Sequence, residues 1–313
     1  MKPLSFNINI LLKQALFIAP VLFMTGAGSC KRTEDDIFSQ DEKFEYYQWE
    51  NHTGVKVFEA PSDFSLPSSE LHQLSIKSKD PEKGHEVKIK ALFVGNLSNI
   101  SEDTLIVFCN GAQYHMDYYY EQIKTLYQCG SPTKYNILTF DYQGLGSSPG
   151  QTSLEALLQD AEAVGAWLNK NEVPTENIIL YGQGLGAVAA SFLAADSQDE
   201  FNSPPTLILE NPVAKTDYLL SNATQLNLPS SFFDQSQFDN IELIKNFKGK
   251  LLMLLSEQDE KYSKSINGEE IYKFHSGIDK ELHVTNANHQ NFVPQTGFLP
   301  YCDLISDFIK HTP

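Results

Sequence analysis

The segment "NIILYGQGLGAVAASFLAA", residues 177–195, is the most informative part of this chain of 313 residues. It opens with an apolar run at 178–181 that has the length and composition of a buried strand. Glycines then occupy positions 182, 184 and 186, and small and apolar residues follow without an intervening loop. The segment therefore predicts a strand, a tight turn and a helix in direct succession.

This layout is that of a nucleophile elbow, a sharp strand-to-helix turn with the pattern G-x-S-x-G. The five positions are occupied here by Gly182, Gln183, Gly184, Leu185 and Gly186. The outer glycines let the strand and helix backbones pack closely around a strained turn. The middle position should carry a hydroxyl or thiol, and Gly184 has neither. Leu185 keeps the backbone N–H that such a site aims at a developing oxyanion.

A second match to the pattern, "GSSPG" at residues 146–150, places Ser148 at its centre. We reject Ser148 as a nucleophile because Pro149 follows it and has no N–H for the oxyanion. The preceding strand is also expected to end near Tyr142, several residues before the position that an elbow requires. We interpret the stretch as a glycine-rich loop between a strand and a helix.

Strands and helices alternate along most of the chain. The clearest helix is expected at 153–170, where Thr152 and Glu155 suggest a capping box. The expected strands are residues 71–78, 85–95, 104–109, 135–142, 177–182, 205–211, 250–260 and the start of 281–292, and the other expected helices are 116–128, 185–195 and 301–311. This order predicts an α/β fold, with a mainly parallel sheet covered by helices on both faces.

Five landmarks in one order resemble the α/β-hydrolase superfamily over roughly residues 70–313. They are "VFCNGAQYH" (107–115), "FDYQGLGSSPGQTSLEALLQDAEAVGAWL" (140–168), "LYGQGLGAVAA" (180–190), "LSEQDEKYS" (255–263) and "NANHQNF" (286–292). The nearest likeness is to the serine-aminopeptidase-like, monoacylglycerol-lipase-like and acyl-protein-thioesterase-like branch. The resemblance implies an α/β-hydrolase fold with a mostly parallel eight-stranded sheet and a small lid.

The resemblance also implies an active site. It places the acid at Asp259 and the base at His289, in the order elbow, acid, histidine that this superfamily uses. An ionised Asp259 against one imidazole nitrogen would leave the other nitrogen as a base. The alternative is that His289 is an ordinary histidine of a surface loop. The implied oxyanion-hole donors are the N–H of Leu185 and that of Ala112 or Gln113.

The first 29 residues have the features of a targeting segment. The apolar run "ALFIAPVLFM", residues 15–24, is too short to span a bilayer and matches the h-region of a secretory signal. Small residues before Cys30 resemble a bacterial lipobox, and the charged residues 31–36 resemble the surface-export signal of some Bacteroidetes lipoproteins. We expect lipidation of Cys30 and anchoring to a membrane of the cell envelope, with exposure at the surface. Secretion or a periplasmic location is the alternative.

Composition narrows the partners. The chain carries 40 Asp and Glu against 23 Lys and Arg, a formal net charge of −17, which argues against nucleic acid as a partner. Beyond Cys30, Cys109 is expected in the core, and Cys129 and Cys302 could form a disulfide in an oxidising compartment. The cysteine and histidine spacings fit no metal template. We therefore expect no metal and no cofactor.

We divide the chain into a signal peptide (1–29), a tether (30–43) and one α/β-hydrolase domain (44–313) with a lid at about 213–248. Several apolar residues of the lid would either line a pocket or pack the lid down. They are Leu219, Leu220, Leu226, Phe232 and Phe233.

The missing hydroxyl decides between functions, because without it no covalent acyl-enzyme forms. One hypothesis is a non-catalytic or weakly active protein that binds an acyl or peptidyl-type ligand, either a small molecule or a peptide. The alternative is an enzyme that hydrolyses esters, thioesters or amides with a water molecule. In that case Asp259 and His289 activate the water in the space that Gly184 leaves open.

Overall fold

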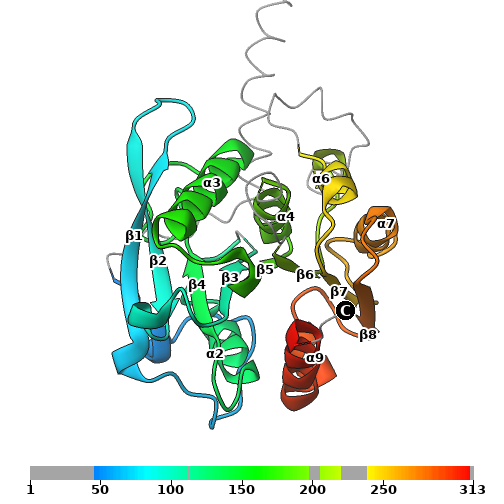
Figure 1. The fold of residues 1–313 in the computed structure, drawn as a ribbon, viewed down its shortest axis with the longest axis horizontal. Coiled ribbons are helices and arrows are strands. Elements are labelled where there is room, and N and C mark those ends of the chain that lie inside the picture. Colours follow the sequence, from blue (N-terminus) through cyan, green and yellow to red (C-terminus); the bar gives the residue numbers. More distant parts are fainter. Residues whose placement is uncertain (1–45, 112, 197–204, 220–237, 311–313) are drawn as a thin grey trace, which may run out of the picture.

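The computed structural model describes residues 46–111, 113–196, 205–219 and 238–310, which form an eight-stranded sheet between two layers of helices (Figure 1). The strand order is β1-β2-β4-β3-β5-β6-β7-β8. The strands are β1 (Leu71–Lys79), β2 (Glu86–Val94), β3 (Leu105–Cys109), β4 (Asn136–Phe140), β5 (Ile178–Gln183), β6 (Thr206–Glu210), β7 (Leu251–Ser256) and β8 (Lys280–Thr285). Only the pairings β1–β2 and β2–β4 are antiparallel, so the expected mostly parallel eight-stranded sheet is confirmed.

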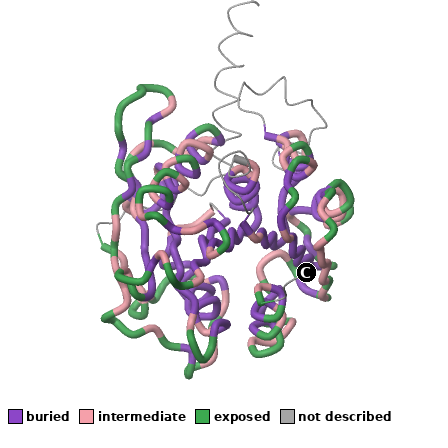
Figure 2. The backbone as a smooth tube through the Cα atoms, in the orientation of Figure 1, coloured by how far each residue is buried: buried purple, intermediate pink, exposed green. Residues whose placement is uncertain are grey.

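Helices cover both faces of this sheet (Figure 1). On one face lie α3 (Leu154–Lys170), α4 (Gly186–Asp196), α6 (Asn240–Asn246) and α7 (Gly268–Phe274). On the other face lie α2 (Tyr120–Cys129), α8 (Phe292–Thr296) and α9 (Phe298–Lys310). Each face has its own cluster of buried apolar side chains, and the central strands are buried along their whole length (Figure 2). This explains why β3, β5 and β7 are continuous apolar runs in the sequence.

Two details of the sequence interpretation were wrong. The N-cap of α3 is Ser153 and not Thr152, because the Ser153 hydroxyl accepts the N–H of Ala156 at 3.0 Å. Helix α2 begins at Tyr120 rather than at residue 116. The residues before it form tight turns, in which Tyr118 donates its N–H to the carbonyl of His115 and Tyr119 donates its N–H to the carbonyl of Met116.

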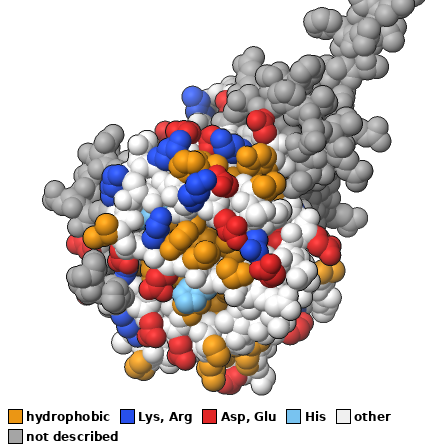
Figure 3. Space-filling model, turned by 90° about the vertical axis from the view of Figure 1, so that its right-hand side faces the viewer, with side chains coloured by type: hydrophobic (Ala, Val, Ile, Leu, Met, Phe, Trp, Pro, Cys, Tyr) orange, Lys and Arg blue, Asp and Glu red, His pale blue; other side chains and the backbone are white. Residues whose placement is uncertain are grey.

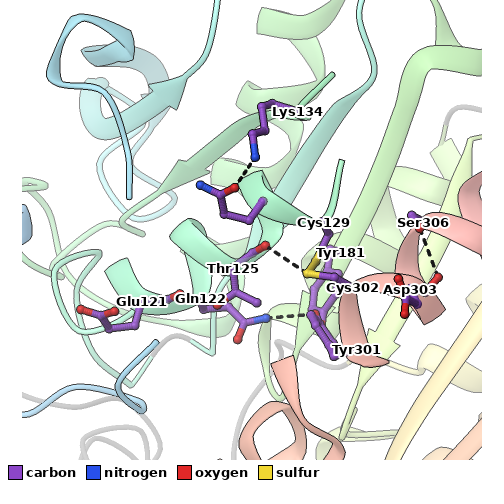
Figure 4. Close-up of a disulfide and its surroundings, with 11 residues drawn as sticks. Glu121, Gln122, Thr125, Cys129, Lys134, Tyr181, Tyr301, Cys302, Asp303 and Ser306 are labelled. Carbon is purple, nitrogen blue, oxygen red and sulfur yellow. Dashed lines mark hydrogen bonds between the residues drawn. A yellow bond between two sulfur atoms is a disulfide. The ribbon is translucent and has the colours of Figure 1, made fainter. Parts of the chain in front are cut away.

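A disulfide joins the ends of two helices on the same face. Cys129, the last residue of α2, pairs with Cys302 in α9, and their Cα atoms are 4.3 Å apart (Figure 4). The sequence left this pairing open. Cys109 is free and fully buried in β3, which confirms its expected place in the core.

The lid prediction can be compared with the structure only at its two ends. Residues 216–219 are helical, and a bridge joins Lys215 to Asp239 just before α6. Of the apolar lid residues, Leu219 packs into the core, whereas Leu220, Leu226, Phe232 and Phe233 lie outside the described residues. The predicted signal peptide, Cys30 and the tether lie outside them as well. Within the described ranges, no helix is long and apolar enough to cross a membrane.

Candidate active site

The turn after β5 has the shape of a nucleophile elbow. Gly184 adopts φ +55°, a left-handed conformation that costs a residue with a side chain about 1–2 kcal/mol. The flanking glycines are required by close packing. A Cβ atom at Gly182 would lie 2.5 Å from the Cα of Ala187, and one at Gly186 would lie 2.1 Å from the carbonyl oxygen of Cys109. The glycine spacing in the sequence therefore reflects contact between β5, β3 and α4.

The structure brings Asp259 and His289 together. The Nδ1 atom of His289 lies 2.9 Å from Oδ2 of Asp259, and both residues lie on loops at the carboxyl end of the parallel strands. The other carboxylate oxygen of Asp259 accepts the backbone N–H groups of Lys261 and Tyr262, each at 2.8 Å. These three contacts hold the carboxylate in one orientation. They favour the imidazole tautomer that carries its proton on Nδ1 and leaves Nε2 free to act as a base.

The free nitrogen of His289 faces the empty position of the elbow. A Cβ atom on Gly184 would lie 3.3 Å from Nε2 of His289 and 3.5 Å from a ring carbon of Tyr262. The Tyr262 ring also meets the imidazole edge to face, with 5.0 Å between the ring centroids. Of the three positions named from the sequence, Gly184 and His289 therefore face each other, and Asp259 binds His289 at its opposite nitrogen.

The loop that carries His289 is held by a residue that the sequence interpretation missed. Asn211 follows β6 and donates from Nδ2 to the backbone carbonyl of His289 and to the hydroxyl of Ser256, both at 2.9 Å. Its Oδ1 accepts the N–H of Ser256 at 2.7 Å. The available signal was a polar residue at the end of an apolar strand, at the edge of the sheet where sites of this fold class lie.

The expected oxyanion-hole residues can be placed in part. Leu185 is buried directly before α4, so its N–H lies at the start of that helix. Gln113 lines a cavity of about 10 Å³ together with His289, Gly111 and Gln183. Ala112 lies outside the described residues. The loop of Gln113 and the elbow thus lie on either side of the space in front of His289.

A buried hydrogen-bond chain lies beneath the elbow. Glu210, the last residue of β6, is fully buried and accepts hydrogen bonds from the Tyr181 hydroxyl and, at 2.9 Å, from Nε2 of Gln183. The Tyr181 hydroxyl in turn accepts from Tyr301. Burial raises the pKa of the Glu210 carboxyl from 4.5 to about 7, and the charge of Asp259 adds to the rise. Burial likewise lowers the pKa of the Lys261 ammonium to about 8.

Ser148 has a structural place in the fold. Its hydroxyl donates to the backbone carbonyl of Asp141 at 2.7 Å and accepts the N–H of Lys90 at 2.8 Å. Both of its hydrogen-bonding functions are thus used to join β2 to the loop after β4. Within the described ranges, no group of three or more His, Cys, Asp or Glu side chains is arranged to hold a metal ion.

Curated relatives match parts of the chain. The human alpha/beta hydrolase domain-containing protein 17B is 30% identical over 138 residues, which are 42% of this chain and 42% of that protein. The lysophosphatidylserine lipase ABHD12 of Danio rerio is 33% identical over 87 residues, 28% of this chain and 22% of the lipase. The matches therefore span less than half the length of these two relatives.

Solved structures and a family model match more of the chain. The esterase Pf2001 of Pyrococcus furiosus superposes with a TM-score of 0.58 at 17% identity, covering 88% of this chain and 98% of the esterase. The esterase domain of a Rhodothermus marinus protein gives 0.51 at 12% identity, covering 76% and 97%. At these identities the likeness shows the α/β-hydrolase fold alone. The family model for "serine aminopeptidase, S33" matches residues 101–287, more than half of the sequence, and the chain belongs to this family of α/β-hydrolases.

Proposed function

We propose that this protein hydrolyses esters, thioesters or amides slowly, using a water molecule that the Asp259–His289 pair activates at the elbow. The observation that carries the proposal is the 3.3 Å separation between Nε2 of His289 and the point where a side chain of residue 184 would begin. The base is oriented by Asp259, and residue 184 places no side chain in front of it. A water molecule beyond the Cβ point, within hydrogen-bonding distance of Nε2, would take roughly the position that a serine hydroxyl has in the rest of the superfamily.

The reaction needs no covalent intermediate. The water oxygen attacks the carbonyl carbon of the substrate while one of its protons passes to Nε2 of His289. The carbonyl oxygen becomes an oxyanion, which the N–H of Leu185 and an N–H of the loop at Gln113 would stabilise. When the tetrahedral intermediate collapses, the bond to the leaving group breaks. The imidazolium then returns its proton to that alcohol, thiol or amine, so His289 ends neutral.

The expected rate is low. In another serine hydrolase, removing the nucleophile lowers kcat on the order of 10⁶-fold and leaves roughly 10³–10⁴ of acceleration over water. The residual acceleration there comes from binding and from the oxyanion hole. An oriented base adds to these contributions, and general-base catalysis is typically worth about 10²–10⁴. Activated esters and thioesters are the substrates on which such a rate can be measured.

A second candidate function is non-catalytic binding of an acyl or peptidyl-type ligand. The glycine at the elbow favours it, because the family's covalent chemistry cannot take place at Gly184. In this reading the former active site holds a ligand without cleaving it. The two functions differ in one measurable property, which is hydrolysis that depends on His289.

The test uses the protein without its first 30 residues and short-chain nitrophenyl esters and thioesters as substrates. His289→Ala removes the base, and His283→Ala is the matched control because His283 lies on β8 and pairs with Glu281, away from Gly184. We expect turnover that falls to background in His289→Ala and stays unchanged in His283→Ala. Equal rates in all three proteins would exclude water activation and leave the binding role.

The cellular location is part of the same proposal. The small residues before Cys30 support lipidation of that cysteine, and two or more acyl chains would hold the protein at a membrane of the cell envelope. Secretion without a lipid is the alternative.

The surface charge bears on the class of partner. The face around α6, α7 and β8 carries acidic and basic side chains side by side with apolar ones, and no purely basic patch is seen on it (Figure 3). The net charge of −17 likewise argues against nucleic acid as a partner.

A further inference from the structure

The side chain of Gln183 precedes the elbow glycine and uses only one end of its amide. Its Nε2 donates to Oε1 of Glu210 at 2.9 Å. Its Oε1 is buried and has no hydrogen-bond partner among the described residues. The residue as a whole is only 4% exposed, so bulk water does not supply this partner. Buried polar atoms nearly always have a partner, which is often an ordered water molecule.

A cavity of matching size adjoins this residue. It has a volume of about 10 Å³ and is lined by Gln183, His289, Gly111 and Gln113, among others. One ordered water molecule needs about 10–15 Å³ and two or more polar partners. Both Gln183 and His289 carry an acceptor, namely the unpartnered Oε1 of Gln183 and, in the tautomer that Asp259 favours, Nε2 of His289. The cavity therefore has the volume and the polarity for a single water molecule.

We propose that Gln183 is a positioning residue that holds the attacking water against His289. This inference rests on the proposed function and adds to it the residue that places the nucleophile. The water donates one hydrogen to Oε1 of Gln183 and the other to Nε2 of His289, so that a lone pair remains for the carbonyl carbon. Two fixed acceptors restrict the water to one orientation, which lowers the entropic cost of reaching the transition state.

The orientation of the Gln183 amide is set by Glu210 and by the hydrogen-bonded residues behind it. Burial raises the pKa of the Glu210 carboxyl to about 7, so above that pH Glu210 is a carboxylate, which can only accept hydrogen bonds. The amide then turns its NH₂ group toward Glu210 and its carbonyl away. The other carboxylate oxygen already accepts the hydroxyl of Tyr181. Tyr181 accepts from Tyr301 at 2.9 Å, and Tyr301 accepts from Gln122 at 3.1 Å (Figure 4). This directional chain runs from α2 and α9 to the elbow and keeps Oε1 of Gln183 as the free acceptor.

Two variants test the role of the Oε1 acceptor of Gln183 separately from the size of its side chain. Gln183→Met keeps a similar length without an amide carbonyl. Glu210→Gln leaves Gln183 intact but offers it an N–H donor. The Gln183 amide would then flip, with its carbonyl toward residue 210 and its NH₂ group toward the cavity. We expect both variants to lower the kcat of the His289-dependent hydrolysis at least about 10-fold, the equivalent of about one net hydrogen bond, with KM unchanged. A loss of packing alone would raise KM or lower stability instead.

A crystal structure of the wild-type protein is the second measurement. We expect a water molecule within about 3.2 Å of both Oε1 of Gln183 and Nε2 of His289, and none in that position in Gln183→Met. An empty cavity in the wild type would overturn the inference, as would an unchanged kcat in both variants while hydrolysis still required His289. If the water is present but no hydrolysis depends on His289, the placement by Gln183 stands and the proposed function fails.

Discussion

Nε2 of His289 lies 3.3 Å from the point that a Cβ atom of Gly184 would occupy. Asp259 holds the same imidazole at its other nitrogen, and Asn211 binds the backbone carbonyl of His289. A serine at this point would bring its hydroxyl within hydrogen-bonding reach of the base. His289 and Asp259 therefore make the contacts on which the proposed reaction depends, while residue 184 has no side chain.

Gly184→Ser should restore covalent catalysis. We expect nitrophenyl ester hydrolysis to rise at least about 100-fold over the wild type, because an assembled nucleophile accounts for on the order of 10⁶ in another serine hydrolase. A fluorophosphonate probe should label the variant and not the wild type. Gly184→Ala is the matched control, with the same Cβ and no hydroxyl. If the Gly184→Ser variant remained unlabelled, the base and the oxyanion hole would not be assembled as the geometry indicates.

The same substitutions should lower stability. Gly184 has φ +55°, and a side chain in this left-handed region costs about 1–2 kcal/mol. We expect Gly184→Ala and Gly184→Ser each to lose about this much free energy of unfolding in urea titrations. The backbone part of this loss should be the same in both variants, and the hydrogen bond between the serine hydroxyl and His289 should offset part of it in Gly184→Ser. No loss in either would mean that the elbow relaxes to another conformation.

Asp259→Asn should abolish the His289-dependent activity while preserving the fold. Oδ1 of Asp259 accepts two backbone N–H groups, so an asparagine would keep its oxygen there and turn its NH₂ group toward Nδ1 of His289. Nδ1 must then accept, and the proton moves to Nε2, where the base is needed. Hydrolysis should fall to the level of His289→Ala, and nitrogen NMR should show the exchanged tautomer. Retained activity would show that Asp259 does not orient the base.

Most of the fold could be predicted from sequence because its signals are local. The apolar runs of β3, β5 and β7 and the glycines of the elbow act over a few residues, and these three strands formed where their patterns indicated. Gly184, Asp259 and His289 could be named because they fall in short stretches typical of one superfamily. The side chains that support them could not be named in this way.

Those supporting contacts join residues far apart in the chain. Tyr181 meets Tyr301 across 120 positions, and Asn211 meets His289 across 78, without any local pattern that links them. Each partner alone is an ordinary polar residue. Asn211 follows β6 and His289 follows β8, so their pairing depends on the strand order β6-β7-β8. Tyr301 meets Tyr181 because α9 packs on the face of the sheet to which Tyr181 belongs.

Glu210 should make stability depend on pH. Its pKa is raised from 4.5 to about 7 in the folded protein, so the folded state holds the proton more tightly than the unfolded state. The resulting stabilisation is complete below about pH 4.5 and is lost as the pH rises through 7, by at most about 3 kcal/mol. Glu210→Gln cannot ionise and should lack this loss. Urea titrations of both proteins at pH 5 and pH 8 should therefore show the variant gaining about 2–3 kcal/mol relative to the wild type. If the free energies of unfolding of the two proteins changed in parallel between pH 5 and pH 8, the buried Glu210 carboxyl would not be the cause of the pH dependence.

The disulfide between Cys129 and Cys302 should stabilise the domain and the chain of hydrogen bonds beneath the elbow. It closes a loop of 173 residues in sequence separation, and disulfides of this kind typically contribute about 2–4 kcal/mol. The double variant Cys129→Ala, Cys302→Ala should lose about that much free energy of unfolding. Reductant should bring the wild type to the level of the variant and leave the variant unchanged. Because Tyr301 precedes Cys302 in α9, amide hydrogen exchange in α9 should also rise on reduction. Exchange that stays the same would mean that packing alone holds Tyr301 against Tyr181.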